Sequence, residues 1–379
     1  MWCTPSWTRA STSRSATDRG VAMALTPLNR RRLELFRANR RGYWSLRIFL
    51  VLFAASLAAE FIANDKPILF SQGGKLHFPI LFNYSEVELG GVLETEAEYR
   101  DPFVMALIEE DGWAIWPPLR FSHDTIDYSY EITPSPPDGT HILGTDGGAT
   151  DVFAKLLYSF RLSVLFGLGL TAISSAIGVT VGALQGYFGG LVDLLGQRLV
   201  EIQTGLPILF VLIILASIVE PNVYWLLVIL SLFSWMALVG VVRAEFLRAR
   251  NFEFVRAAKA LGVSDMTILR RHVLPNAMVA TLTYLPFILN GSITSLTALD
   301  FLGFGLPLDS PSFGRLLSAA KANLHAPWLG ISVFITLALL LTLLIFVGEG
   351  VRDALDPRRA MTQRGDDEST GDLVNLQTA

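Results

Sequence analysis

Long apolar runs dominate this 379-residue chain and limit what it can fold into. Four of them are Ile48–Ala59, Ile208–Val219, Trp225–Val242 and Ile331–Val347. With their flanking turns, several reach the roughly 20 apolar residues that cross a bilayer. Only 17% of the residues are charged, against about 25% in an average soluble domain. The sequence therefore predicts an integral membrane protein and excludes a soluble enzyme, a disordered chain, a coiled coil and a disulfide scaffold.

The apolar runs predict an all-α membrane bundle with six transmembrane helices. The expected helices lie near residues 45–63, 162–186, 207–221, 224–243, 279–303 and 329–348. The third helix is short, so we expect it to include part of its flanks. An even number of crossings places both ends of the chain on one side of the membrane.

Charged residues are distributed unequally between the two sides of these helices. Residues 1–47 contain ten arginines and two acids, whereas residues 64–155 contain five basic residues and sixteen acids. Basic residues remain on the cytoplasmic side, so this difference predicts cytoplasmic N- and C-termini and an external segment 64–155. The same orientation places residues 243–276 inside, and that stretch carries seven basic residues against three acids.

The chain divides into six expected parts. These are a disordered extension at 1–22, a basic amphipathic lead-in at 23–44, a first span at 45–63, an external (periplasmic) insert at 64–155, a core of five spans at 156–348 with a cytoplasmic loop at 252–276, and a cytoplasmic tail at 349–379. Residues 1–22 lack the apolar stretch of a secretory signal. A basic transit-like leader and an over-extended start before Met23 are the alternatives for this extension.

The external segment is expected to form a small, β-rich α+β unit. Gln72-Gly73-Gly74-Lys75 is typical of a hairpin turn, and residues 125–132 alternate like a strand. The unit is either a structured cap on the membrane domain or a docking surface for a soluble partner. Its histidines have no metal-ligand spacing, so we expect surface or core positions for them and no metal site.

The sequence contains no recognisable energy source or catalytic cluster. It has no GxxxxGKS or GxxxxGKT phosphate loop, no nucleophile with a plausible base and no zinc-type cluster. Ionisable residues are almost missing from the predicted helices; the exception is Asp300, which we expect either to cap the end of its helix or to hydrogen-bond the backbone of the turn at 301–307. We therefore predict that the chain is not an enzyme, binds no cofactor and depends on a partner for energy. The net charge of −4 argues against nucleic-acid binding.

The cytoplasmic loop 252–276 is predicted to be a stiff helical lever. Residues 254–261 form an Ala-rich helical stretch that Gly262 ends. Ser264 or Asp265 caps a second helix at 266–273, which stops before Pro275. This lever is pinned between two spans and has no motor of its own, so it implies a motor protein bound to it.

A second pattern places a small residue at every fourth position of the second predicted helix. Its members are Ser174, Gly178, Gly182, Gly186 and Gly190. Such a face lets another helix approach closely. The neighbour is either a helix of the same bundle or a helix of a second subunit.

The loop carries the run Arg256-Ala257-Ala258-Lys259-Ala260-Leu261-Gly262, followed by Leu274-Pro275. This pattern resembles the EAA loop of ABC importer permeases, which docks in a groove of the ATPase subunit. Arg256 stands where that family has a glutamate. The resemblance implies that the coupling residues are Arg256, Ala257, Ala258, Gly262, Leu274 and Pro275.

Three further stretches resemble motifs of dipeptide and oligopeptide permeases. They are Leu143–Asp146 with Asp151-Val152, then Arg161–Ser163, then Phe301–Gly305. The family's Gly-Arg-Asp-Val run has no arginine here, because Thr150 precedes Asp151. The resemblance covers about residues 25 to 359.

The resemblance implies a type I permease fold and a subunit of a peptide importer in a bacterial inner membrane. The implied partners are a related permease subunit that completes a heterodimer, ATPase subunits that bind ATP and Mg²⁺ at the cytoplasmic face, and a periplasmic substrate-binding protein. The implied cargo is peptides, including peptide–nucleotide antibiotics of the microcin C type. Membrane lipid surrounds the spans.

Two other functions compete with this interpretation. A self-contained secondary transporter or channel predicts mid-membrane ionisable residues or an internal repeat, and neither is apparent in the sequence. A membrane-embedded enzyme requires a catalytic cluster near an interface, and the sequence offers none. The permease subunit therefore fits the residues better than either alternative.

Overall fold

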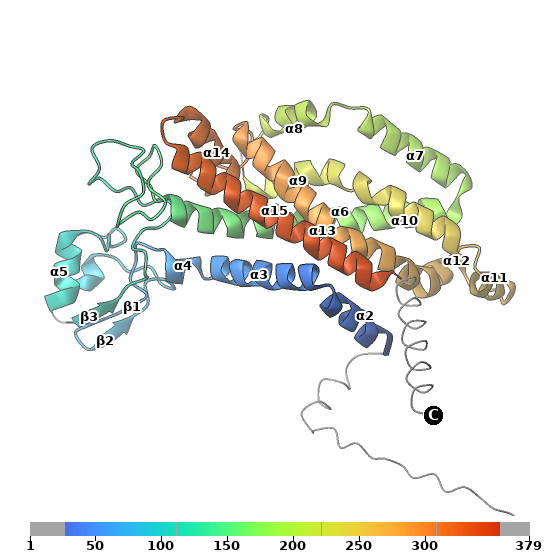
Figure 1. The fold of residues 1–379 in the computed structure, drawn as a ribbon, viewed down its shortest axis with the longest axis horizontal. Coiled ribbons are helices and arrows are strands. Elements are labelled where there is room, and N and C mark those ends of the chain that lie inside the picture. Colours follow the sequence, from blue (N-terminus) through green and yellow to red (C-terminus); the bar gives the residue numbers. More distant parts are fainter. Residues whose placement is uncertain (1–26, 111, 221, 308, 357–379) are drawn as a thin grey trace, which may run out of the picture.

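A computed structural model of the protein describes residues 27–110, 112–220, 222–307 and 309–356. The expected extension at 1–22, the start of the lead-in and residues 357–379 of the tail lie outside these residues. Long helices run along the longest axis, and a small sheet lies at one end (Figure 1). We call this end the sheet end, and the opposite end, which carries residues 250–276, the loop end.

Three helices are long and apolar enough to cross a membrane by themselves. They are α6 (Val152–Phe188), α13 (Leu274–Phe301), which qualifies from Thr281 onward, and α15 (Pro327–Leu355). α6 begins ten residues before the predicted start at 162 because Asp151 caps it, accepting a hydrogen bond from the Ala154 N–H at 2.7 Å. The first turn of α6 therefore belongs to the predicted insert 64–155.

Two bent pairs of helices supply further candidate spans. α7 (Gly190–Thr204) joins α8 (Ile208–Ala216) at an angle of 76°, and α9 (Val223–Ser234) joins α10 (Met236–Ala249) at 43°. The short helix predicted near 207–221 corresponds to α8, which has only nine residues, and the flank that completes this candidate span is α7. Pro207 lies directly before α8. Because proline has no backbone N–H, α7 cannot continue unbroken into α8, and the pair is bent at this point.

The first predicted span, 45–63, is divided between α3 (Arg40–Leu57) and α4 (Ala59–Ile62). α3 includes three arginines near its start and does not qualify as a span by length and composition. The described residues thus contain three candidate spans, or five if each bent pair is one span. The six-span bundle stays a prediction.

Other helices lie at the two ends of the bundle. The lead-in contains α2 (Pro27–Ala38), which packs against α15, and Asn39 donates a hydrogen bond to the Asp353 carboxylate at 3.0 Å. Asp353 belongs to α15, because this helix continues to Leu355 and so includes the first residues of the predicted tail. α14 (Phe313–Ala322), at the other end, was not predicted.

α6 lies at the centre of the bundle and packs against α3, α9, α10 and α13. One apolar cluster joins four helices through Phe49, Phe160, Ile293 and Leu340, which are all buried. A second cluster surrounds Phe246 and Val273 and fills the loop end. Separate apolar clusters thus fill the middle of the bundle and the loop end.

The sheet end contains a three-stranded antiparallel sheet in the order β2-β1-β3. Its strands are β1 (Leu69–Gln72), β2 (Lys75–His77) and β3 (Gly112–Ile115), with α5 (Pro102–Glu110) leading into β3. The predicted hairpin turn is confirmed, since Gly73 and Gly74 both have positive φ.

The strand predicted at 125–132 is wrong. Only one bridge, between Ile126 and Thr150, forms there. Asp127 accepts a hydrogen bond from the Ser129 N–H at 3.1 Å, and this side-chain turn ends the extended backbone.

Candidate functional site

The loop at 252–276 is a helix–glycine–helix, as the sequence predicts. α11 (Glu253–Ala260) ends before Gly262, which has φ +78° and donates its N–H to the Lys259 carbonyl at 3.0 Å. This left-handed conformation favours glycine. α12 (Asp265–Ile268) follows after a short turn.

The second helix of the loop does not stop before Pro275, so that prediction is wrong. α12 continues through a π-helical segment, η2 (Leu269–Val273), directly into α13. Proline lacks an N–H and clashes with the carbonyl four residues earlier in a regular α-helix. The wider π turn precedes Pro275 and lets the helix continue past it. The loop is therefore joined rigidly to a membrane-spanning helix.

The loop has one buried and one exposed face. Val255 and Ile268 are fully buried in the apolar cluster at the ends of α6 and α10. Phe254, Met266 and Leu261 are exposed, and Leu261 keeps 83% of its surface. Large apolar side chains gathered on an exposed surface mark an interaction site.

The predicted coupling residues fall on both faces of the loop. Arg256, Ala257, Gly262 and Pro275 are exposed. Ala258 and Leu274 are half-buried against the apolar cluster.

A polar tether that the sequence did not reveal fixes the loop to α6. The Tyr187 hydroxyl donates a hydrogen bond to Asp265 Oδ1 at 2.7 Å. Lys259 Nζ lies 3.2 Å from the same carboxylate and 4.9 Å from the centre of the Tyr187 ring. The hydrogen bonds from Tyr187 and Lys259 lower the pKa of Asp265 below its usual range. No sequence pattern links residues this far apart; the tether emerges only in the fold.

The small-residue face of α6 packs against α10 of the same chain. A Cβ atom at Gly178, Gly182 or Gly186 would lie 2.5–2.9 Å from a backbone oxygen of Trp235, Val239 or Arg243 respectively. Any larger side chain would force the two helices apart.

The two ends of the small-residue series behave differently. Ser174 is buried on the same stretch of α6. Gly190 lies outside the contact, because it begins α7 with φ +56° and a Cβ there would meet nothing within 4 Å. The packing face therefore ends at Gly186.

The motif at 143–152 forms the turn that starts α6. Asp146 accepts hydrogen bonds from Gly148 and Thr150, and its other oxygen lies 2.5 Å from Lys155 Nζ. Gly144 has φ +74° and lies so close to the Ser135 carbonyl that a Cβ would be 2.6 Å from it. The motif thus sets the position of the helix.

His141 is a buried member of this turn and lies between two aspartates. Its Nδ1 is 2.7 Å from Asp151 Oδ2, and its Nε2 is 3.2 Å from Asp127 Oδ2. Burial favours a raised pKa for Asp127, but hydrogen bonds with Ser129 and His141 outweigh it and hold this pKa below its usual range. Of the two positions predicted for the histidines, surface or core, His141 occupies the core.

Asp300 occupies the turn that the sequence assigned to it. It is buried at the end of α13, and its Oδ1 accepts a hydrogen bond from the Leu306 N–H at 2.6 Å. The side chain therefore closes the turn that follows α13, as predicted.

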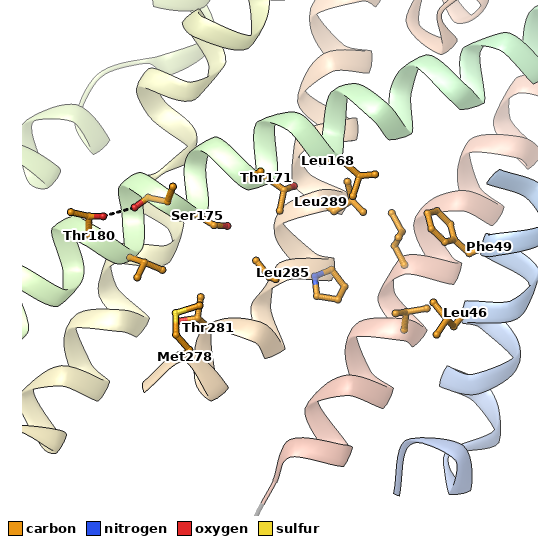
Figure 2. Close-up of a pocket in the computed structure, with 16 residues that line it drawn as sticks. Leu46, Phe49, Leu168, Thr171, Ser175, Thr180, Met278, Thr281, Leu285 and Leu289 are labelled. Carbon is orange, nitrogen blue, oxygen red and sulfur yellow. Dashed lines mark hydrogen bonds between the residues drawn. The ribbon is translucent and has the colours of Figure 1, made fainter. Parts of the chain in front are cut away.

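A cavity of about 650 Å³ lies between α3, α6, α13 and α15 (Figure 2). Its lining is mainly aliphatic and includes Phe49, Leu285 and Leu289. The hydroxyls of Thr171 and Ser175 line it as well and have no hydrogen-bond partner among the described residues. No charged residue lines the cavity, so it suits apolar groups.

Comparisons with known proteins identify the class. Residues 178–361 match the family described as binding-protein-dependent transport system inner membrane component. The chain is 59% identical over 338 residues to the inner membrane ABC transporter permease protein YejE of Escherichia coli strain K12, covering 89% of this chain and 99% of that protein.

Two further relatives show the same class. The peptidoglycan transport system permease protein YejE of Agrobacterium fabrum is 53% identical over 359 residues, covering 88% of this chain and 94% of that protein. The oligopeptide transport system permease protein OppC of Haemophilus influenzae is 33% identical over 257 residues, covering 68% and 81%.

The chain therefore belongs to the permeases of binding-protein-dependent ABC transporters, which are multi-pass inner-membrane components. The matched family region contains α10, the whole 252–276 loop and α13. A self-contained transporter and a membrane-embedded enzyme are set aside by this membership.

Proposed function

We propose that the chain is the permease subunit of an ATP-driven importer that moves peptides across a bacterial inner membrane. The loop end lies in the cytoplasm and the sheet end lies outside. The excess of basic residues at 243–276 and of acids at 64–155 supports this orientation. Two of the relatives described above have transport of peptidoglycan or oligopeptides in their names.

The exposed apolar face of the loop carries this proposal. Phe254, Leu261 and Met266 project from short helices whose other face is buried in the core. An ATPase subunit that covers this face would receive its apolar side chains, and closure of two such subunits would pull on α12 and hence on α13. Arg256, Ala257, Ala258, Gly262, Leu274 and Pro275 are the coupling residues in this arrangement.

The complete importer would contain several partners. A second, related permease completes a heterodimer in a type I arrangement of six spans each, and a soluble binding protein delivers the peptide at the sheet end. ATP and Mg²⁺ bind to the ATPase subunits, and hydrolysis takes place there. This chain contributes the path and the lever.

The cargo is peptides, and three kinds of peptide can be tested as substrates. Free oligopeptides correspond to the OppC relative, and peptide fragments of peptidoglycan correspond to the Agrobacterium relative. Peptide–nucleotide antibiotics of the microcin C type are the third group. All three contain a peptide backbone.

Reconstitution of the complete complex tests the function. The chain is co-purified with the second permease, the ATPase and the binding protein, and the complex is placed in proteoliposomes. We expect ATP hydrolysis and uptake to rise when the binding protein carries a peptide, and to remain basal with the unloaded binding protein. The three cargo groups are compared in parallel. Failure of all three to stimulate either hydrolysis or uptake would contradict peptide import.

A further inference from the structure

α7 presents a pair of charged side chains on the outside of the bundle. Arg198 and Glu201 are in contact as an i, i+3 ion pair, yet their side chains remain 67% and 56% exposed. The other acid of α7, Asp193, is instead paired with a neighbouring helix. Asp193 receives two hydrogen bonds from Arg243 of α10, at 2.5 and 2.7 Å. Among the residues that the structure describes, the exposed pair therefore has no side-chain partner beyond itself.

Contacts with neighbouring helices fix the depth of the pair. Gln197 donates a hydrogen bond to Gln185 near the loop end of α6, at 2.6 Å. At the other end of α7, the Thr204 hydroxyl lies 3.9 Å from the sulfur of Met236, at the middle of the α9–α10 pair. A rise of 1.5 Å per residue places the two charges about 5 and about 9 Å from Thr204. The pair thus lies between the loop end and the middle of a span.

Two different surfaces of α7 face away from the bundle. Arg198 and Glu201 form one strip, because residues three apart lie on the same side of a helix. Leu195, Leu199 and Ile202 are also exposed and occupy the adjoining surface, and Leu194, one turn before Arg198, is exposed on the same side as the pair. Lipid or an apolar helix can cover the aliphatic surface without cost. A charged side chain at the centre of a bilayer costs about 3 kcal/mol on insertion scales, so the charged strip requires water or polar groups.

We propose that the strip of Arg198 and Glu201 lines the aqueous path of the transported peptide and contacts its charged groups. This inference rests on the proposed function. A peptide carries an ammonium group and carboxylate groups, for which a carboxylate and a guanidinium are matched hydrogen-bond partners. When no peptide is present, the two side chains neutralise each other and leave no isolated charge in the membrane.

The cavity in Figure 2 is a poor site for the same cargo. Its lining is aliphatic with a few hydroxyls and contains no charged side chain, so the charged ends of a peptide would lose their hydration without compensation. The strip on α7 is the polar surface that a peptide path requires.

Cysteine accessibility in the assembled complex tests the inference. Cys3 is the only cysteine of the chain, and Cys3→Ser provides a background without thiols. Arg198→Cys and Leu199→Cys are then made separately; they lie at the same depth but about 100° apart around α7. The probe is a positively charged, membrane-impermeant methanethiosulfonate reagent, applied to the complex in proteoliposomes.

We expect the thiol at 198 to react at least about tenfold faster than the thiol at 199, because a thiol in an apolar environment is not ionised and does not react. Saturating peptide-loaded binding protein with ATP should slow modification at 198 and leave the rate at 199 unchanged. Equal rates at the two positions, or no reaction at 198 with every ligand, would overturn the inference. The second result would mean that another protein surface covers the strip.

The kinetics of peptide uptake provide an independent test of the same inference. Arg198→Gln and Glu201→Gln keep the size and polarity of the side chains and remove one charge each. We expect a KM for peptide uptake raised at least about threefold in each variant, since each loses a charge-assisted hydrogen bond. An unchanged KM in both variants would also overturn the inference. If the wild-type complex imports peptides and these tests fail, the proposed function stands and only the assignment of the strip fails.

Discussion

The two ends of α6 are held by opposite kinds of contact. At the sheet end, Asp151 caps the helix and is bonded to His141, and both residues are fully buried. At the loop end, a hydrogen bond from Tyr187 reaches Asp265 beside an apolar cluster. That cluster leaves Leu261 almost fully exposed.

This difference contrasts a buried polar turn at the start of α6 with an exposed apolar loop near its other end. At the start of α6 the buried carboxylates are satisfied within the chain, because Asp151 and Asp127 both bond His141. The loop end keeps its apolar side chains in water, which is unfavourable unless another protein covers them. The comparison therefore predicts that changes at the sheet end affect folding, whereas changes at the loop end affect coupling.

The largest effect is expected from Gly262→Pro at the loop end. Proline fixes φ near −65° and has no N–H, so it cannot adopt φ +78° or donate to the Lys259 carbonyl. We expect loss of peptide-stimulated uptake with a membrane-inserted complex, measured in proteoliposomes. The matched control is Gly262→Asn, because asparagine tolerates the left-handed conformation. Uptake by the proline variant at the wild-type rate would show that the loop is no lever.

His141→Leu is the corresponding change at the sheet end. It leaves two buried carboxylates without their shared hydrogen-bond partner, and leaving a buried polar group unsatisfied costs about 1–3 kcal/mol. We expect a loss of this size in the free energy of unfolding, measured by denaturant titration of the detergent-purified chain.

A second histidine provides the control for that experiment. His325 is exposed, so His325→Leu should change the free energy of unfolding by less than about 0.5 kcal/mol. Equal stabilities for the two variants would remove the distinction between the two ends.

The sequence predicted those features that depend on neighbouring residues. The helix–glycine–helix of the loop, the hairpin at Gly73-Gly74 and the turn closed by Asp300 all follow from local patterns, and the structure contains them. Residue type and position were sufficient for these predictions because the partners lie within a few residues.

Other features could not be predicted, for two physical reasons. The links from Tyr187 to Asp265 and from His141 to Asp127 join residues that no periodic pattern relates. α7 was missed because polar and charged residues interrupt its apolar ones, so the apolar run alone suggested one short helix at 207–221. The helix past Pro275 was missed because a π turn, which sequence does not signal, accommodates the proline.

Tyr187→Phe should have a smaller effect at the loop end. It removes one hydrogen bond to a carboxylate, which is worth about 1.5–3 kcal/mol, and keeps the ring that Lys259 contacts. We expect the ratio of peptide transported to ATP hydrolysed to fall, with basal hydrolysis unchanged. Asp265→Asn is the paired variant, and the double variant should add little to either. Full additivity of the two changes would indicate that the tether does not act as a unit.

The smallest effect concerns the pH dependence of the sheet end. Burial favours the protonated form of Asp146, but Lys155 and the hydrogen bonds from Thr150 outweigh it and hold the pKa of Asp146 below its usual value in the folded chain. A carboxyl with a lowered folded-state pKa stabilises the fold above its unfolded pKa and loses this contribution as the pH falls through its folded pKa. We expect the Asp146→Asn variant to lose less unfolding free energy than the wild type as the pH falls below about 4, measured by denaturant titration at a series of pH values. The control is Asp309→Asn, which changes an exposed carboxyl. A pH profile of Asp146→Asn that matches the wild type would show that Asp146 does not contribute to the acid sensitivity of this end.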